Sequence, residues 1–323
     1  MSNEPVRLIY LLQQEDPTVR SRAAEALHRI GLAAVPALIE ALKDREWYPD
    51  RYENHLYLRD GAAEALEIIG SVAVPTLLEA LKDEDVSRQA AKVLGRIGLP
   101  AMPSLIEALK DRSESVRQAA ATALEGMGAA AKSAAPALIE ALKDKKATVR
   151  TGAAKALGSI GPEAKPAAAG LIEMLKDKNE YVRAAAAYAL GGIGPQGKAT
   201  IPALIEVLND KNEYVCTSAV AALIEIGSAV VPALIEVLKD EDSHVRRRAA
   251  AALARMGPAA VPALVEVLKD ERWYVRRSAA ENLGEIGPEA KAALDALREL
   301  EKSLDADVRR SAAKAIEKIT GHL

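Results

Sequence analysis

Phenylalanine is absent from this chain of 323 residues, in which two tryptophans and eight tyrosines are the only aromatic side chains. Cys216 is the single cysteine, which excludes an intramolecular disulfide. The four histidines, His28, His55, His244 and His322, lack the spacing of zinc or facial-triad ligands. The patterns G-x-x-x-x-G-K-S/T, G-x-S-x-G and C-x-x-C are also missing. The sequence therefore predicts no metal, no cofactor and no catalytic residues, and a protein that is not an enzyme.

Neither sign of charge dominates, since the net charge is -3 and the pI is about 6.0. Such a chain has no general attraction for phosphate backbones or anionic membranes, so a nucleic-acid partner would require a local basic patch. A basic start followed by an apolar run is missing, and no run reaches the roughly 18 apolar residues of a membrane span. We therefore expect a cytoplasmic protein without a membrane partner.

What the chain does contain is an internal repeat of 30 or 33 residues: PALIEALKD, a short polar link, and VRxxAAxALxxIG. Within VRQAAATALEGMG, the apolar residues Val116, Ala120, Leu124 and Met127 fall on one face of a helix with 3.6 residues per turn. PALIEALKD shows the same period. Each repeat is therefore predicted to form a pair of amphipathic helices.

Residues that start and stop helices agree with this period. A glycine closes the VRxxAAxALxxIG helix, counted here as the first helix of each pair, as a residue free to adopt positive φ should: Gly31, Gly70, Gly98, Gly128, Gly161, Gly194, Gly227, Gly257 and Gly287. An N-cap residue is predicted four residues before the recurrent arginine: Asp16, Ser113, Asn179, Asn212, Asp242 and Asp305.

The repeats, of which DRSESVRQAAATALEGMG is one copy, resemble the HEAT-repeat family, and specifically the short HEAT-like repeats of the phycobilisome-lyase type, over residues 5–320. The resemblance implies an all-α fold: a right-handed α-solenoid (superhelix) of about nine HEAT-like helix pairs with an extended concave binding surface. We expect a single repeat domain over residues 1–323. It has N-terminal units at 5–44, a loop insertion at 45–58, central repeats at 59–287 and a C-terminal cap at 288–323.

The family also implies a ladder in which an aspartate at the end of one helix pairs with an arginine six residues later. An aspartate at a helix C-terminus opposes the helix dipole and calls for a compensating cation. The expected pairs are Asp111 with Arg117, Asp144 with Arg150, Asp177 with Arg183, Asp240 with Arg246, and Asp270 with Arg276. Two repeats depart from the pattern, because Ser87 and Cys216 stand at the arginine position. We interpret Cys216 as a buried packing residue in preference to a reactive thiol.

One enzyme with HEAT-like repeats, deoxyhypusine hydroxylase, binds two irons through His-Glu pairs directly after the ladder arginine. No His-Glu pair occurs at the corresponding positions of this sequence. The resemblance therefore gives no support for di-iron chemistry.

Arginines beyond the ladder accumulate near the C-terminus, and repeat stacking predicts a stripe able to bind carboxylates or phosphates: Arg247, Arg248, Arg277 and Arg310. Nearby acids leave a merely solvated face as the alternative. The central repeats carry small residues at corresponding positions, from Gly152 to Ala221, which fit either a partner surface or tight internal packing.

The link DREWYPDRYENHLYLRD is nine residues longer than the others. Its candidates for partner binding are Trp47, Tyr48, Tyr52 and His55, because insertions in solenoid repeats often serve binding. A loop that caps the N-terminal repeats is the alternative.

These observations predict a non-catalytic scaffold or adaptor that binds a protein or peptide of unknown identity along the concave surface. The alternative is a tetrapyrrole (bilin) lyase or chaperone-like factor similar to the phycobilin lyases, with the residues of the insertion around the chromophore. A third possibility is weak binding of anions or nucleic acid through the C-terminal arginines.

Overall fold

The computed structural model describes residues 4–12, 14, 16–43, 52–194 and 199–321, and for residues 4–6 and 52–57 it describes the backbone alone. Over these ranges the chain forms α-helices and short 3-10 helices, with no strand. The predicted all-α solenoid is confirmed. The chain contacts divide it into two compact units, Met1–Ala167 and Ala168–Leu323.

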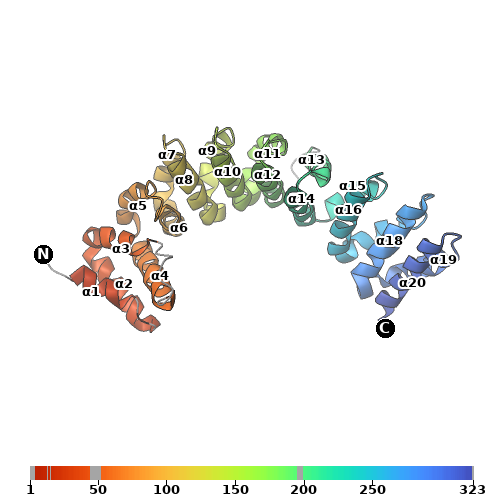
Figure 1. The fold of residues 1–323 in the computed structure, drawn as a ribbon, viewed down its shortest axis with the longest axis horizontal. Coiled ribbons are helices and arrows are strands. Elements are labelled where there is room, and N and C mark those ends of the chain that lie inside the picture. Colours follow the sequence, from red (N-terminus) through yellow and green to blue (C-terminus); the bar gives the residue numbers. More distant parts are fainter. Residues whose placement is uncertain (1–3, 13, 15, 44–51, 195–198, 322–323) are drawn as a thin grey trace. The chain divides into compact units, whose positions relative to one another are not determined.

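The first unit alternates short and long helices (Figure 1). Its short helices are α1 (Glu4–Leu11), α3 (Val35–Ala41), α5 (Val74–Ala80), α7 (Met102–Ala108) and α9 (Ala135–Ala141). Its long helices are α2 (Pro17–Ile30), α4 (Tyr52–Ile69), α6 (Ser87–Ile97), α8 (Glu114–Met127) and α10 (Ala147–Ile160). The 3-10 helices are η1 (Gly31–Ala34), η2 (Gly70–Ala73), η3 (Leu99–Ala101), η4 (Gly128–Ala134) and η5 (Gly161–Ala167).

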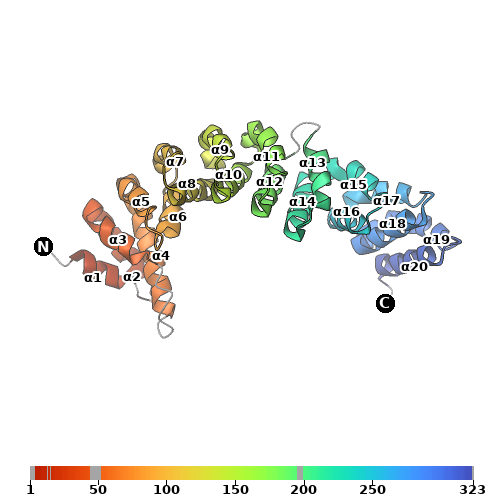
Figure 2. The same cartoon turned by 45° about the horizontal axis from the view of Figure 1, so that its top comes forward.

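The second unit repeats this arrangement (Figure 2). Its short helices are α11 (Ala168–Met174), α13 (Thr200–Glu206), α15 (Val231–Val237), α17 (Val261–Val267) and α19 (Leu294–Leu300). Its long helices are α12 (Glu180–Ile193), α14 (Glu213–Ile226), α16 (Ser243–Arg255), α18 (Trp273–Ile286) and α20 (Ala306–Thr320). The 3-10 helices are η6 (Val207–Asn209), η7 (Ser228–Val230), η8 (Gly257–Ala260) and η9 (Gly287–Ala293).

The core of each unit lies between its short-helix and long-helix layers. Leucines on both layers are completely buried, for example Leu190 on α12, Leu204 on α13 and Leu223 on α14. Alanine fills most of the remaining buried positions, which lets helices approach without aromatic side chains between them. Among the described residues the helices form ten pairs, one more than the repeat text predicts. The additional pair is α1 and α2. These two helices pack against each other, even though α1 lacks the Pro-Ala-Leu-Ile sequence of the other short helices.

The predicted helix ends are confirmed. All nine glycines have positive φ, between +56° at Gly128 and +84° at Gly194 and Gly227. Five of the six predicted N-caps accept a backbone N–H at the helix start: Asp16, Asn179, Asn212, Asp242 and Asp305. Ser113 stands at its N-cap position but pairs its hydroxyl with that of Ser115.

Some glycines of the long helices face the next long helix with no room for a side chain. A Cβ on Gly191 of α12 would lie 2.8 Å from Ala222 Cα of α14, closer than real Cβ contacts. A Cβ on Gly284 of α18 would lie 3.0 Å from Ala315 Cα of α20. The small residues Ala184, Ala185 and Ala187 of the central repeats are buried. For these residues, tight internal packing is therefore the correct interpretation.

The prediction of a loop at residues 45–58 is wrong for the second part of this range. Residues 52–58 are helical and form the start of α4, while residues 44–51 lie outside the described residues. YENHLYL contains no proline or glycine, so nothing in it stops the helix from extending toward the N-terminus. The single-domain prediction and its other boundaries stay predictions.

One described segment, Leu58–Ala80, is long and apolar enough to cross a membrane by length and composition. It comprises the end of α4, η2 and α5, and 44% of its apolar window is buried. The helices Glu213–Ile226 and Ser228–Val237, taken together, are also long and apolar enough, but the chain bends by 113° between them. Both segments follow the helix-glycine-helix pattern of the other repeats, so packing within the solenoid accounts for their apolarity.

Candidate partner-binding surface

The arginine ladder is built between repeats. Arg117 Nε lies 2.6 Å from Asp144 Oδ2 of the next repeat, and both side chains are mostly buried. The same pair recurs in the second unit, where Arg183 Nε lies 2.7 Å from Asp210 Oδ2. Burial alone would raise the pKa of the Asp144 carboxyl, but the hydrogen bond from Arg117 lowers it below its ordinary value. Each such pair joins two consecutive repeats.

The pairing differs in detail from the expected one. Arg117 meets Asp111 through the backbone, with Nη1 donating to the Asp111 carbonyl oxygen at 2.9 Å. The Asp111 carboxylate instead accepts the backbone N–H of Ser113. The arginine that would reach it is missing, because Ser87 stands at the arginine position of the preceding repeat. Sequence spacing places both residues at one link, but it does not show that the carboxylate comes from the following repeat.

Arg248 is not part of the exposed stripe. It donates from Nη1 to the Leu208 carbonyl oxygen at 2.6 Å and pairs with Glu213, with 15% of its side chain exposed. It therefore lies against the repeat in which Cys216 replaces the ladder arginine. The Cys216 thiol donates to the Asp210 carbonyl oxygen, and burial raises its pKa. Cys216 is buried, as predicted.

The ladder is open toward the C-terminus. Arg246, Arg276 and Arg309 donate to carbonyl oxygens of their own links, and no described carboxylate forms an ion pair with them. The Asp270 carboxylate that would serve Arg246 is occupied by Arg272, through two hydrogen bonds of 2.9 Å. This guanidinium lowers the pKa of Asp270 to about 2. The starts of α16, α18 and α20 therefore each carry a ladder arginine without an ion pair to a described carboxylate.

The other three arginines of the predicted stripe lie at equivalent positions on these consecutive long helices. Arg247 of α16 is exposed, and its Nη2 lies 3.3 Å from His244 Nδ1. Arg277 of α18 lies over the Trp273 ring, with Cζ 5.5 Å from the centroid. Arg310 of α20 lies 3.1 Å from an Asp307 oxygen.

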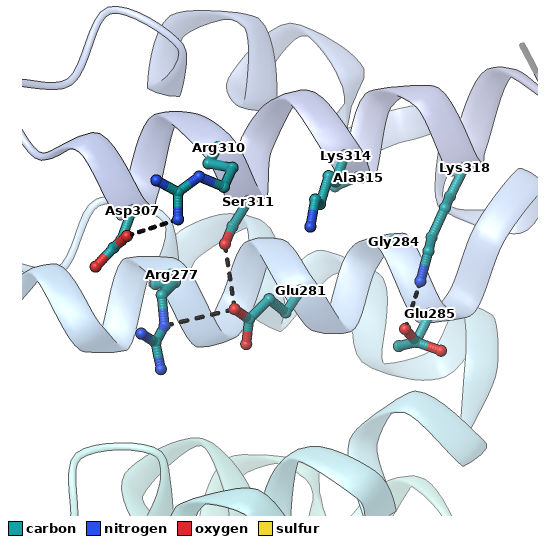
Figure 3. Close-up of a pocket in the computed structure, with 10 residues that line it drawn as sticks. All are labelled: Arg277, Glu281, Gly284, Glu285, Asp307, Arg310, Ser311, Lys314, Ala315 and Lys318. Carbon is teal, nitrogen blue, oxygen red and sulfur yellow. Dashed lines mark hydrogen bonds and ion pairs between the residues drawn. The ribbon is translucent and has the colours of Figure 1, made fainter. Parts of the chain in front are cut away.

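Two neighbouring cavities lie along this stripe and share Arg277 and Glu281. The first, of about 290 Å³, lies between α18 and α20 (Figure 3). The second, of about 340 Å³, lies between α16 and α18. We call the two together the C-terminal groove; its charged or titratable lining residues are His244, Arg246, Arg247, Arg277, Glu281, Glu285, Asp307, Arg310, Lys314 and Lys318.

Earlier in the second unit the long helices expose tyrosines. Tyr181 and Tyr188, two turns apart on α12, are 60% and 48% exposed, and Tyr214 on α14 is 54% exposed. The rings of Tyr181 and Tyr214 are 6.3 Å apart between centroids. We call these three residues the tyrosine patch. The patch was not among the predicted sites, although Tyr181 and Tyr214 hold the same position two residues before the ladder position.

Lys314 and Lys318 were not among the predicted site residues either. They follow Arg310 at intervals of four residues, a spacing that places all three on one helix face. The predicted candidates Trp47 and Tyr48 lie outside the described residues. Tyr52 and His55 lie on the first turns of α4, where only the backbone is described. Ligand binding by the insertion and capping by it both stay predictions.

No group of three or more His, Cys, Asp or Glu side chains among the described residues is placed to hold a metal ion. Most of the glutamates near the ends of the short helices form surface ion pairs with lysines three residues later, as in Glu79 with Lys82 and Glu236 with Lys239, while Glu206 pairs with Lys176. The arrangement supplies cationic, hydroxyl and aromatic groups suited to contacting a partner.

Alternating short and long helices, joined repeat to repeat through buried arginine and aspartate pairs, define a two-layer helical repeat protein. Models of HEAT repeats match residues 50–125, 102–169, 168–242 and 231–317, and a PBS lyase HEAT-like repeat matches residues 19–44. The chain belongs to the HEAT-repeat family. Comparison with curated proteins gives no match.

Similar folds occur among solved structures. An engineered protein from the Northeast Structural Genomics Consortium is 23% identical over 99% of both chains, with a TM-score of 0.43. A structure of Kap95p with RanGDP and one of the Kap95:Nup1 complex are each 15% identical, with TM-scores of 0.50. Both cover 100% of this chain and 56% of the other, so the chain spans about half the Kap95 length. At 15% identity, the likeness to the two Kap95 structures shows the fold alone.

Proposed function

We propose that the chain is a non-catalytic scaffold that binds a protein or peptide along the exposed face of its long helices. The observation that carries this proposal is the tyrosine patch. Its three tyrosines are 48–60% exposed while alanine, leucine and valine fill most of the core, so these side chains contribute little to the core. Exposed tyrosine, tryptophan and arginine are the residue types enriched where proteins bind one another.

The second unit concentrates such residues on one helix layer. Trp273 on α18 is 43% exposed, and Arg277 lies over its ring. Stacking on an aromatic face restricts a guanidinium while leaving its N–H groups available to a ligand. Kap95, which has a similar fold, binds other proteins: one of the two structures concerns the binding of Kap95p to RanGDP, and the other is the Kap95:Nup1 complex. We further propose that the binding surface is concave and that the protein is cytoplasmic.

The proposal is tested by selecting peptides from a random display library on the immobilised full chain. We expect enriched peptides whose binding falls at least about tenfold in the variant Tyr181→Ser/Tyr188→Ser/Tyr214→Ser, a loss of about 1.4 kcal/mol. Tyr10→Ser is the matched control, because Tyr10 is 63% exposed on the short helix α1. Failure to enrich any peptide contradicts the scaffold function, and equal loss in both variants contradicts the assigned surface.

The bilin alternative rests on Trp47, Tyr48, Tyr52 and His55, whose side chains lie outside the described residues. No described observation favours it. An absorbance shift on incubation with a bilin, removed by Tyr52→Ala, would replace the scaffold proposal with it.

A further inference from the structure

We propose that the C-terminal groove binds an extended acidic peptide segment of a partner protein, with carboxylates about three residues apart. This inference rests on the scaffold function proposed above and names the class of partner. It applies to α16, α18 and α20, which all lie in the second unit.

The groove carries an excess of positive charge, because its arginines and lysines outnumber its carboxylates. Six arginines and lysines line the groove against the three carboxylates of Glu281, Glu285 and Asp307, leaving +3 in a chain whose net charge is -3. Arg247 and Lys314 form no ion pair with a described carboxylate. Lys314 lies between the Arg310–Asp307 and Lys318–Glu285 pairs (Figure 3). Charge complementarity therefore favours an anionic occupant.

The cationic groups of the groove have neighbours that restrict their positions. Arg277 lies between the Trp273 ring and Glu281, and its Nε is 3.4 Å from Glu281 Oε1 in an ion pair without a hydrogen bond at Nε. Ser311 donates to that same carboxylate at 3.1 Å. Arg310 is oriented by Asp307. Side chains restricted in this way lose less conformational entropy when a ligand binds.

The spacing of the three exposed arginines matches that of side chains on an extended peptide. Arg247, Arg277 and Arg310 each follow the ladder arginine of their own helix directly, so successive guanidiniums are offset by one repeat. Packed helices lie about 8–10 Å apart. A polyproline II segment has three residues per turn and rises about 3.1 Å per residue, so every third side chain faces the same way at about 9 Å intervals. Glutamates at every third position therefore match the three arginines.

The carboxylates of the groove favour a peptide over a nucleic acid. Glu281 and Glu285 face the same space as Arg310 and Lys314 (Figure 3). They interrupt the positive charge of the groove, so the groove offers separate cationic positions that suit spaced carboxylates and lacks the continuous basic track that a phosphate backbone favours. The acidic pI of the chain adds no general attraction for a polyanion.

The test is fluorescence anisotropy with the full chain and three labelled peptides of equal length. The spaced peptide is EPSEPSEPS, the clustered isomer is EEEPSPSPS, and the neutral peptide is QPSQPSQPS. We expect the spaced peptide to bind at least about tenfold more tightly than either control. The variant Arg247→Gln/Arg277→Gln/Arg310→Gln should lose this preference. The matched control Arg88→Gln/Lys92→Gln/Lys155→Gln removes three cations from long helices of the first unit and should bind within about twofold of wild type.

Equal binding of the clustered and spaced peptides contradicts the spacing, and unchanged binding by the groove variant contradicts the location. Tighter binding of single-stranded oligothymidylate, with a steep salt dependence, would assign the groove to nucleic acid instead. If the tyrosine patch selects peptides from the library while the spaced peptide fails to bind, the scaffold function stands and only this inference is overturned.

Discussion

Arg248 donates from Nη1 to the carbonyl oxygen of Leu208, 2.6 Å away in the preceding repeat. The sequence separation is 40 residues, so the contact joins two repeats as the ladder arginines do. It occurs at the repeat where Cys216 replaces arginine. The guanidinium also lowers the pKa of the Glu213 carboxyl beside it. We interpret Arg248 as compensation for the missing ladder arginine.

This compensation makes a double-mutant prediction. Arg248→Ala should destabilise the chain by about 1–3 kcal/mol, because it removes charge-assisted hydrogen bonds at a mostly buried site. Cys216→Arg in that background should recover part of the loss, whereas Cys216→Arg alone should destabilise by bringing two guanidiniums together. Urea titration of the four chains measures the coupling. Additive effects of the two substitutions would contradict the interpretation.

The ladder pair makes a second prediction. Arg117→Ala should cost about 2–4 kcal/mol of unfolding free energy, since it leaves the mostly buried Asp144 carboxylate without its cation. Lys302→Ala is the control, because the Lys302–Glu299 pair is exposed and should contribute less than about 1 kcal/mol. Denaturant midpoints of wild type, Arg117→Ala and Lys302→Ala, measured side by side, give the two losses of stability. Equal losses would show that the buried pair has no special role in joining repeats.

Helix contact at glycine makes a third prediction. Gly191→Ala should destabilise by about 1–3 kcal/mol, because the new Cβ would overlap Ala222, although alanine is the better helix former by about 1 kcal/mol. Gly126→Ala is the control, since nothing lies within 4 Å of its added Cβ, and it should be neutral or stabilising. Thermal unfolding of both variants measures the contrast. Stabilisation by both would mean that α12 and α14 can separate freely.

The pair of Asp270 and Arg272 predicts a pH dependence. Arg272 lowers the pKa of Asp270 from the ordinary 3.8 to about 2. A carboxyl with a depressed pKa in the folded chain stabilises it fully above the unfolded pKa, and this contribution is lost as pH falls through the folded pKa. Wild type should therefore exceed Arg272→Ala in stability above about pH 4, and the difference should vanish toward pH 2. Urea titrations across this range measure it, and a difference that grows on acidification would refute the assignment.

Local features of the fold follow directly from the sequence. The glycines with positive φ and the N-caps could be predicted because each acts on its own helix end. The start of α4 could not be placed, because the length of the insertion suggests a loop while YENHLYL is free to extend the helix. Helix extension depends on what the preceding residues pack against, which a single sequence does not contain.

Contacts between repeats were harder to predict. The repeat pattern assigned Arg248 to the same stripe as Arg247, but adjacent residues on a helix point about 100° apart, so only one of them lies on the exposed stripe. Conversely, Lys314 and Lys318 line the groove because they follow Arg310 at intervals of four residues, a spacing that could have predicted their place. The tyrosine patch became visible once the burial of its neighbours showed which face of α12 and α14 remains exposed.

The central claim, that the long-helix face of the second unit binds a peptide, is tested most directly by footprinting the full chain with and without a library-selected peptide. Hydroxyl-radical labelling should be reduced at Tyr181, Tyr214 and Trp273, which are exposed in the free chain. Labelling at Tyr10 on α1 should not change. Protection of Tyr10 with no protection of the other three would contradict the account.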